Sequence, residues 1–257
     1  MSENDGLVII PTYNEKENIE KIVHAVFALE KVFHILVIDD GSPDGTADIV
    51  KRMIQSEFPQ RLFIVERSGK QGLGTAYIAG FKWALSREYE YVFEMDADFS
   101  HDPNDLHRLH HACCDEGFDV AVGSRYVDGI SVVNWSMKRV MMSYFASKYV
   151  RAVTGCKLND TTAGFACWRR KVLETIDLDK IRFKGFAFQI EMKFTAYKIG
   201  FKIKEVSVVF VNRREGKSKM SGGIFGEALF GVIRLRLDGL LRKYPTIRGR
   251  LSENNSF

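Results

Sequence analysis

Short apolar runs alternate with segments of helical periodicity through the first half of the chain. The runs are rich in β-branched residues and predict buried strands at residues 7–10, 35–38, 62–65, 91–95 and 120–122. Between them, apolar residues recur at helical spacing at 18–29, 46–55, 74–85 and 104–116. Such alternation joins strands by right-handed crossovers, so we expect an α/β fold with a mostly parallel sheet flanked by helices.

Local signals mark where some of these elements begin, and the pattern continues less regularly in the second half. Asn14 with Glu17 resembles a capping box, and Asp102 before Pro103 predicts an N-cap followed by proline at the first helical position. In the second half we expect strands and helices in turn, namely strands at 165–168 and 202–211 and helices at 135–153, 190–199 and 224–241.

The last expected helix carries a polar stripe and lies in a basic segment. The stripe recurs at helical spacing and consists of Glu227, Gly231, Arg234, Asp238 and Arg242. The apolar residues that fall mostly away from it are Phe225, Leu229, Phe230, Ile233, Leu237 and Leu241, and Arg236 interrupts them. The helix either packs on the core or lies at a membrane surface. We divide the chain into a domain at 1–221 and an amphipathic, basic membrane-surface segment at 222–257.

Charge supports that division. Residues 213–250 contain ten Lys/Arg and three Asp/Glu, whereas the whole chain has a net charge of +4. Segregated basic charge favours contact with phosphates or an anionic surface. Nucleic acid is not the expected partner, because the segment lacks interleaved aromatic residues and a known binding motif.

Length and composition restrict the class of protein. The 257 residues, 46% of them hydrophobic, are enough for one α/β domain with an ordinary core. The four cysteines show neither a CxxC pair nor zinc spacing, which suits a reducing compartment. Neither a signal peptide nor a run of about 18 apolar residues is visible. We therefore expect a cytoplasmic protein that associates peripherally with the membrane.

Candidate chemistry lies just beyond the predicted strands. Ligands of open α/β sheets bind at the carboxyl ends of the strands, and here these ends lead into residues 11–15, 39–46, 96–103 and 123–126. Three of the four segments carry acids, and the fourth carries Arg125. Acids gathered at one sheet edge repel one another unless a cation or hydrogen-bond donors neutralise them.

Asp96 and Asp98 form the sharpest of these features. Carboxylates two residues apart can point at one cation, and hard oxygen ligands suit Mg²⁺ or Mn²⁺. A lone pair of this kind is typically a solvated loop, but this pair directly follows a buried strand, which favours a metal site. His107, His110, His111, Cys113 and Cys114 also lie close together in sequence, and we expect them to form solvated helix surface rather than a zinc site.

Seven blocks in order resemble family 2 glycosyltransferases with the GT-A nucleotide-sugar fold. The blocks are DDGSPDGT from Asp39, GLGTA from Gly72, MDADFSHDP from Met95, GSRY from Gly123, DTTAGF from Asp160, FAFQIE from Phe186, and the segment from Arg213 to Lys219. More closely, they are similar to dolichyl- or polyprenyl-phosphate mannosyltransferases of the type without transmembrane helices. The resemblance covers nearly the whole chain.

The resemblance implies a role for individual residues. It implies that the donor nucleotide sugar is held by Pro11, Tyr13, Glu15, Asp39, Asp40, Asp96, Ala97, Asp98 and Lys219. Asp96 and Asp98 would bind the metal, and Arg125, Arg139 and Ser143 would face the acceptor phosphate. Asp98, Arg125, Arg139 and Arg213 would carry the catalysis. Some relatives have Gln two residues after the second Asp, where this chain has Ser100, so direct metal coordination at this position is in doubt.

The resemblance also implies a reaction. It is the metal-dependent, inverting transfer of mannose from GDP-mannose to a polyprenyl phosphate at the cytoplasmic membrane face, with a membrane partner subunit as a possible associate. A UDP-glucose-dependent glucosyltransferase acting on polyprenyl phosphate, or another family 2 enzyme, is the first alternative. A non-catalytic membrane-associated binding subunit is an alternative from a different class.

Overall fold

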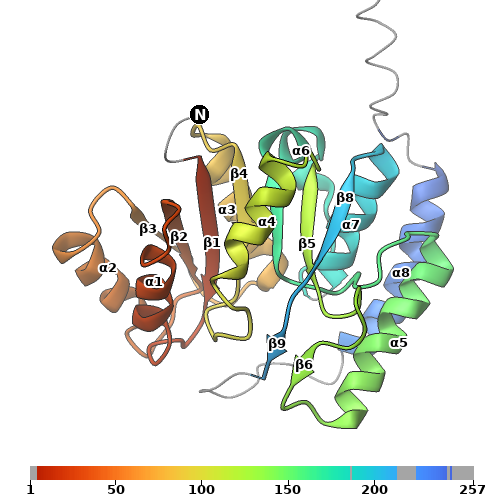
Figure 1. Cartoon of the computed structure of the whole chain (residues 1–257), viewed down its shortest axis with the longest axis horizontal. Helices are drawn as coiled ribbons and strands as arrows, with labels where there is room; N and C mark the ends of the chain where they lie inside the picture. Colours follow the sequence, from red (N-terminus) through yellow and green to blue (C-terminus); the bar gives the residue numbers. More distant parts are fainter. Residues whose placement is uncertain (1–4, 186, 213–223, 242–243, 245–257) are drawn as a thin grey trace, which may run out of the picture.

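The computed structural model describes residues 5–185, 187–212, 224–241 and 244, and within the last helix it describes the side chains of residues 231–239. A seven-stranded sheet in the order β3-β2-β1-β4-β7-β5-β8 forms its centre (Figure 1). The strands are β1 (Gly6–Thr12), β2 (Phe33–Asp39), β3 (Leu62–Glu66), β4 (Tyr91–Glu94), β5 (Val120–Ser124), β7 (Ala166–Arg169) and β8 (Ile203–Ser207). All neighbours are parallel except β7, which is antiparallel to β4 and β5.

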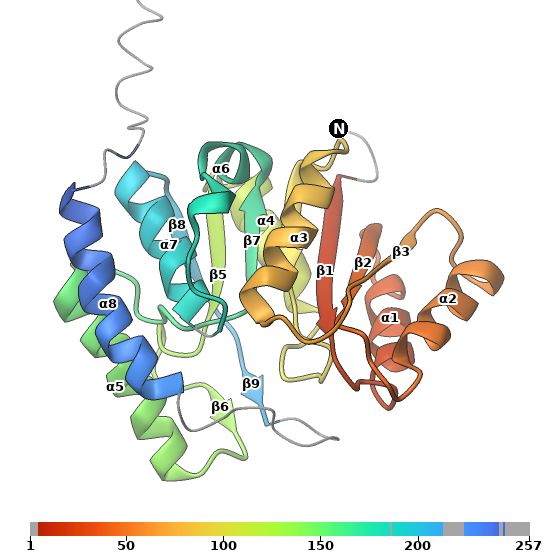
Figure 2. The same ribbon diagram turned by 180° about the vertical axis from the view of Figure 1, so that it is seen from behind.

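Helices cover both faces of this sheet, as the two opposite views show (Figures 1 and 2). One face carries α1 (Ile19–Phe27), α2 (Thr46–Ser56) and α4 (Asp105–Cys114), and the other carries α3 (Leu73–Leu85), α6 (Arg170–Thr175) and α7 (Ala187–Ile199). Successive side chains along a strand point to opposite faces of the sheet, so each central strand contributes apolar residues to the core on either face. Val8 and Ile10 of β1 belong to the first core, and Leu7 and Ile9 belong to the second. The expected α/β fold is confirmed.

The second half departs from the sequence prediction at one strand. The run at 202–211 divides into β8 and a short strand β9 (Phe210–Val211), which pairs in parallel with β6 (Val132–Val133). This small ribbon lies below the carboxyl ends of the main strands in Figure 1. Two residues per strand are too few for a periodic signal, so the sequence pattern does not reveal the ribbon.

Two predicted helix starts are wrong in detail. Helix α1 begins at Ile19 after Asn18, and Asn14 lies four residues earlier in the left-handed region, at φ 56°. The Glu15 amide donates to Thr46 Oγ1 at 3.0 Å, so the segment before α1 is held by the first residue of α2 rather than by a capping box. Helix α4 begins at Asp105, although Asp102 still accepts the Asn104 amide at 2.9 Å and so starts the preceding turn.

Two long helices, α5 (Met137–Thr154) and α8 (Ile224–Leu241), lie side by side beyond the β8 edge. Val150 of α5 packs with Phe194 of α7 and with Val232 and Leu235 of α8 in a third apolar cluster. The described part of α8 therefore packs on the domain, as one of the two interpretations requires, while Ile233 and Leu237 remain exposed. Among the described residues, no helix has both the length and the apolar character needed to cross a bilayer.

Candidate active site

The carboxyl ends of β1, β2, β4 and β5 lie at the same edge of the sheet, the lower edge in Figure 1. Thr12, the last residue of β1, is paired in register with Asp39, the last residue of β2. Strand β4 pairs with the other side of β1 and leads directly to Asp96 and Asp98. The structure thus brings together the segments that the sequence predicts to form a donor site.

Asp39 is buried and organises the loop that follows β2. One carboxylate oxygen accepts the Thr12 hydroxyl at 2.8 Å and the Ser42 hydroxyl at 2.6 Å, and the other accepts the Ser42 amide at 2.8 Å. The same serine receives the Asn14 amide at 3.0 Å. These bonds fix the loop after β2 against the loop after β1, which contains Tyr13 and Glu15, while Pro11 lies near the end of strand β1 itself, next to Thr12. A nucleoside contact by Asp39 stays a prediction.

Asp40 forms an ion pair that the sequence analysis missed. Its carboxylate accepts Arg67 Nε at 2.6 Å and the Gln71 amide at 3.2 Å. Arg67 Nη1 also donates to the Thr75 hydroxyl at 2.8 Å, which ties the loop after β3 to the start of α3. The sequence offered one signal, the position of Arg67, which directly follows β3 just as Asp40 directly follows β2. This pair neutralises one of the acids at the sheet edge.

Asp96 and Asp98 follow β4 with Ala97 buried between them. Asp98 is only 4% exposed, and its Oδ1 accepts the Ser100 amide at 3.1 Å. His101 packs behind this turn, with its ring stacked 4.8 Å from that of Phe165. Burial lowers the pKa of His101 to about 4, so this imidazole is neutral near pH 7 and does not balance the two aspartates.

These residues fit a hard divalent cation. Two carboxylates stand two residues apart, and the buried Ser100 hydroxyl beside them has no hydrogen-bond partner among the described residues. An unpartnered buried oxygen next to two acids is compatible with a cation or with its coordinated water. Asp96 and Asp98 are therefore the residues that would hold Mg²⁺ or Mn²⁺, which would polarise a diphosphate there.

Arg125 is buried in a network of hydrogen bonds. Its Nε and Nη2 donate to Asp160 at 2.6 and 2.7 Å, and Nη2 also reaches the Thr162 hydroxyl at 2.7 Å. Burial would raise the pKa of Asp160, but the Arg125 charge and the hydrogen bonds from Arg125 together outweigh this effect and hold the pKa below its ordinary value. The hydrogen bonds of the guanidinium to described side chains come from Nε and Nη2, and the rings of Tyr126, Trp135 and Phe210 surround it.

The guanidinium groups of Arg139 and Arg125 both lie near the ring of Trp135. The centre of its guanidinium lies 3.9 Å from the Trp135 ring centroid, and that of Arg125 lies 5.5 Å from the same centroid. Arg139 also donates to Asn212 Oδ1 at 2.7 Å. Ser143, one turn further along α5, is half-buried. The structure therefore gathers two of the predicted acceptor residues around Trp135, whereas Arg213 and Lys219 lie outside the described residues.

A second buried polar network lies beneath the site and was also missed. Lys193 of α7 donates to the carbonyl of Ala163 at 2.6 Å and to Gln189 Oε1 at 3.0 Å. The Gln189 amide in turn donates to Glu94, which also accepts Trp168 Nε1 at 2.9 Å. This chain of bonds connects β4, just before Asp96, to the loop that contains Asp160. It therefore couples the two halves of the site.

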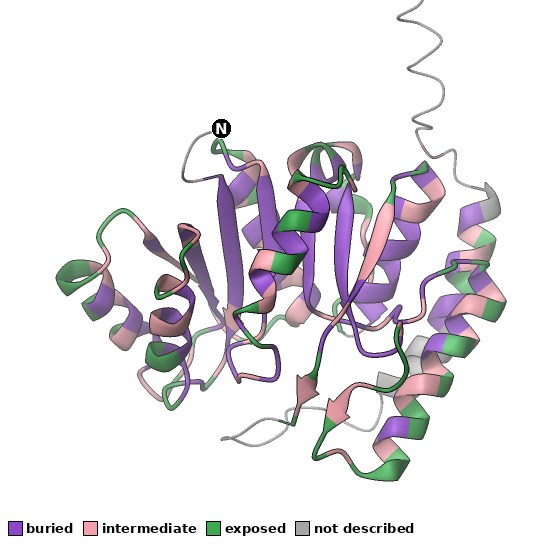
Figure 3. Cartoon of the chain, in the orientation of Figure 1, coloured by how far each residue is buried: buried purple, intermediate pink, exposed green. Residues whose placement is uncertain are grey.

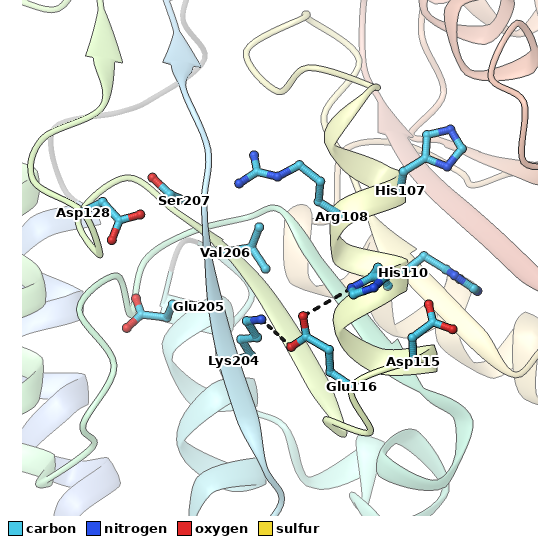
Figure 4. Close-up of a pocket in the computed structure, with 11 residues that line it drawn as sticks. His107, Arg108, His110, Asp115, Glu116, Asp128, Lys204, Glu205, Val206 and Ser207 are labelled. Atoms are coloured by element: carbon cyan, nitrogen blue, oxygen red, sulfur yellow. Dashed lines mark hydrogen bonds and ion pairs between the residues drawn. The ribbon is translucent and has the colours of Figure 1, made fainter.

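The groove between α4 and β8 is a separate feature (Figure 4). Its charged groups are largely paired, since Glu116 contacts both Lys204 and His111. The expectation that the neighbouring histidines and cysteines form solvated surface is wrong for two residues. His110 is buried against the Tyr91 ring at 4.6 Å, and Cys113 is fully buried beneath the sheet, because this side of α4 faces the core.

Comparisons with known proteins agree with this geometry. The model of glycosyl transferase family 2 matches residues 7–177. A polyprenol monophosphomannose synthase of Mycolicibacterium smegmatis is 48% identical over 236 residues, covering 90% of this chain and 88% of that protein. An undecaprenyl-phosphate mannosyltransferase of Micrococcus luteus is 44% identical over 245 residues, covering 95% of this chain and 98% of that protein.

Solved structures share the fold at low sequence identity. Glucosyl-3-phosphoglycerate synthase of Mycobacterium tuberculosis, with Mn²⁺, UDP and phosphoglyceric acid, superposes with a TM-score of 0.65 at 18% identity, covering 91% of this chain and 78% of that one. A mannosyltransferase of Pyrobaculum calidifontis with GDP-Man and Mn²⁺ gives 0.56 at 16% identity, covering 97% and 79%. These likenesses show the fold alone. The family match and the two close relatives show that the chain belongs to glycosyl transferase family 2.

Proposed function

We propose that this enzyme transfers mannose from GDP-mannose to a polyprenyl phosphate, with inversion at the anomeric carbon and with a divalent cation. The observation that carries the proposal is the pair of relatives named for this kind of acceptor, 48% and 44% identical over 90% and 95% of the chain. The geometry supports it, because acids, the buried Arg125 and the partly exposed Arg139 lie at one edge of the sheet, where a donor diphosphate and an acceptor phosphate would need them.

The donor half of the site is assigned to the loops after β1, β2 and β4. The ordered loops around Asp39 and Asp40 would receive the nucleoside, together with Pro11, Tyr13 and Glu15. Asp96 and Asp98 would hold the cation that bridges the diphosphate, with the Ala97 backbone close to the donor. Breaking the sugar–diphosphate bond develops negative charge on the leaving group, so a cation at this point stabilises the transition state. We assign further neutralisation to Arg213 and Lys219.

The acceptor half is assigned to Arg125, Arg139 and Ser143. A phosphate monoester is largely ionised near pH 7, so it attacks without a strong general base and requires positive charge for positioning. Asp160 fixes the guanidinium of Arg125, and Trp135 holds Arg139 beside it. In-line displacement by this phosphate opposite the diphosphate would invert the anomeric centre.

The proposed lipid acceptor determines where the enzyme would work and what it would contact. A polyprenyl phosphate stays in the bilayer, so an enzyme acting on it has to work at the membrane surface. We therefore propose peripheral association with the cytoplasmic face, to which the basic segment at 222–257 would contribute. A membrane partner subunit would be compatible with this arrangement.

Product formation tests the proposal. Radiolabelled GDP-mannose or UDP-glucose is incubated separately with the protein, polyprenyl phosphate and Mg²⁺ or Mn²⁺, and the label extracted with lipid is counted. We expect label from GDP-mannose only. Label from UDP-glucose alone would make the chain a glucosyltransferase, and no lipid label from either donor would support the non-catalytic subunit.

A further inference from the structure

The carboxyl-terminal end of helix α4 gathers three side chains of metal-ligating type. His110 and Cys114 are four residues apart, which places them on the same side of the helix, and Asp115 directly follows its last turn. One ligand atom from each residue lies within 4.8 Å of the other two: an imidazole nitrogen, the thiol sulfur and a carboxylate oxygen. The ligands of a tetrahedral metal lie roughly 3.5 Å apart, so small side-chain rotations would bring these atoms around one cation.

The buried imidazole of His110 has an unsatisfied nitrogen. Its Nε2 has no hydrogen-bond partner among the described residues, and Asp5 Oδ1 lies 3.6 Å from it. A histidine that binds a metal through one ring nitrogen usually turns the other nitrogen toward a carboxylate. Coordination through Nδ1 would leave Nε2 facing Asp5 in this manner. Lys31 contacts the same Asp5 oxygen at 2.9 Å, which holds the carboxylate in place behind the histidine.

The electrostatic surroundings suit a cation. Burial, with a smaller effect of the Lys31 charge, lowers the pKa of His110, so the imidazole is neutral near pH 7, as a metal ligand has to be. The Tyr91 hydroxyl forms a hydrogen bond with Cys114 and would donate to the thiolate that a metal creates. Cys114 is also the last residue of α4, where the helix carries partial negative charge.

This cluster lies far along the strands from the proposed donor site. Tyr91 begins β4 and Asp5 directly precedes β1, so the cluster lies at the amino-terminal edge of the strands, the upper edge in Figure 1, opposite Asp96 and Asp98. Helix α4 is buried where it faces the sheet and exposed on its outer side (Figure 3). Because Cys114 is half-buried and Asp115 is exposed, a cation can reach the cluster from solvent.

We propose that His110, Cys114 and Asp115 form a second metal site, which binds Zn²⁺ and leaves one position of the tetrahedron to water. Nitrogen, sulfur and oxygen ligands together suit this borderline cation, whereas the all-oxygen pair of Asp96 and Asp98 suits Mg²⁺ or Mn²⁺. The site was not expected from the sequence, in which these residues resemble solvated helix surface. Zn²⁺ bound here stabilises the folded state and takes no part in the transfer, so the inference does not depend on the proposed reaction.

Cobalt titration of the metal-free protein tests the inference, because Co²⁺ can replace Zn²⁺ and a thiolate ligand gives it an intense charge-transfer absorption band. We expect Co²⁺ to produce this band with the wild-type protein and Zn²⁺ to remove it by displacement. Cys114→Ala should lose the band, and Asp115→Asn, a change at an exposed side chain, should weaken Co²⁺ binding at this site by roughly tenfold or more. The matched controls are Cys156→Ala, at a buried thiol elsewhere, and Asp98→Asn, and both should keep the band and its Co²⁺ affinity within about twofold.

Thermal unfolding gives a second readout. It is measured in the Asp98→Asn background, which removes one ligand of the other proposed metal site. Zn²⁺ should raise the melting temperature of this protein, and adding Asp115→Asn should abolish the rise. Three outcomes would each overturn the zinc site: no charge-transfer band with the wild-type protein, a band that persists in Cys114→Ala, or unchanged Co²⁺ affinity in Asp115→Asn.

Discussion

Arg125 and Asp160, 35 residues apart in sequence, form two parallel hydrogen bonds, from Nε to Oδ2 at 2.6 Å and from Nη2 to Oδ1 at 2.7 Å. Both side chains are buried, at 9% and 0% exposure. A bidentate pair of this kind fixes the plane of the guanidinium as well as its position. Arg125 is therefore presented to the site in one orientation, and its partner is as important as the arginine itself.

Asp160→Asn should damage both stability and activity. The change leaves the Arg125 charge buried without a carboxylate, so we expect a loss of about 3–5 kcal/mol in the free energy of unfolding. At temperatures where the variant stays folded, misorientation of the guanidinium should lower lipid product formation by about 100-fold. Denaturant unfolding and the transfer assay measure the two effects. Asp177→Asn, at an exposed ion pair with Lys180, is the control and should change neither.

Lys193→Met should destabilise the fold more at pH 8 than at pH 5. Burial raises the pKa of Glu94 to about 7, and the Lys193 charge limits that rise. A carboxyl whose pKa is raised in the folded state stabilises the fold at low pH and loses that contribution as the pH rises. Removing Lys193 raises the pKa of Glu94 further, so the extra cost appears as the pH rises through about 7 and reaches about 1 kcal/mol at pH 8.

Urea unfolding at the two pH values measures this effect, with the exposed Lys202→Met as the control. An equal loss for Lys193→Met at both pH values would show that the lysine acts only through its hydrogen bonds to Ala163 and Gln189.

Much of this arrangement follows from local patterns. The strands and most helices were predictable because burial imposes alternating or helical periodicity, and the ends of parallel strands necessarily converge. The positions of Asp39, Asp96 and Asp98 at one edge follow from that argument. The partners of buried ions do not, because Asp160, Arg67 and Lys193 reach their partners through tertiary contacts that carry no periodic signal. Asn14 shows the same limit, since a neighbouring loop overrides its local capping preference.

Nucleotide titration should distinguish the donor bases. In the presence of Mn²⁺ we expect GDP to bind at least about tenfold more tightly than UDP, which corresponds to a difference of about 1.4 kcal/mol in binding free energy. Isothermal titration calorimetry with both nucleotides measures this difference. Binding of UDP alone would replace the proposed GDP-mannose donor with a uridine nucleotide sugar, while the family assignment would stand.

The central claim is that a cation held by Asp96 and Asp98 makes a nucleoside diphosphate an adequate leaving group. The most direct test is a Mn²⁺ titration of lipid product formation by the wild-type protein, by Asp98→Asn, and by Asp102→Asn, whose side chain caps the turn before α4. We predict that wild-type activity requires the metal, that Asp102→Asn retains most of it, and that Asp98→Asn stays folded with activity at least about 100-fold lower at every metal concentration. Wild-type activity in Asp98→Asn, or full turnover of the wild-type protein in EDTA, would contradict the claim.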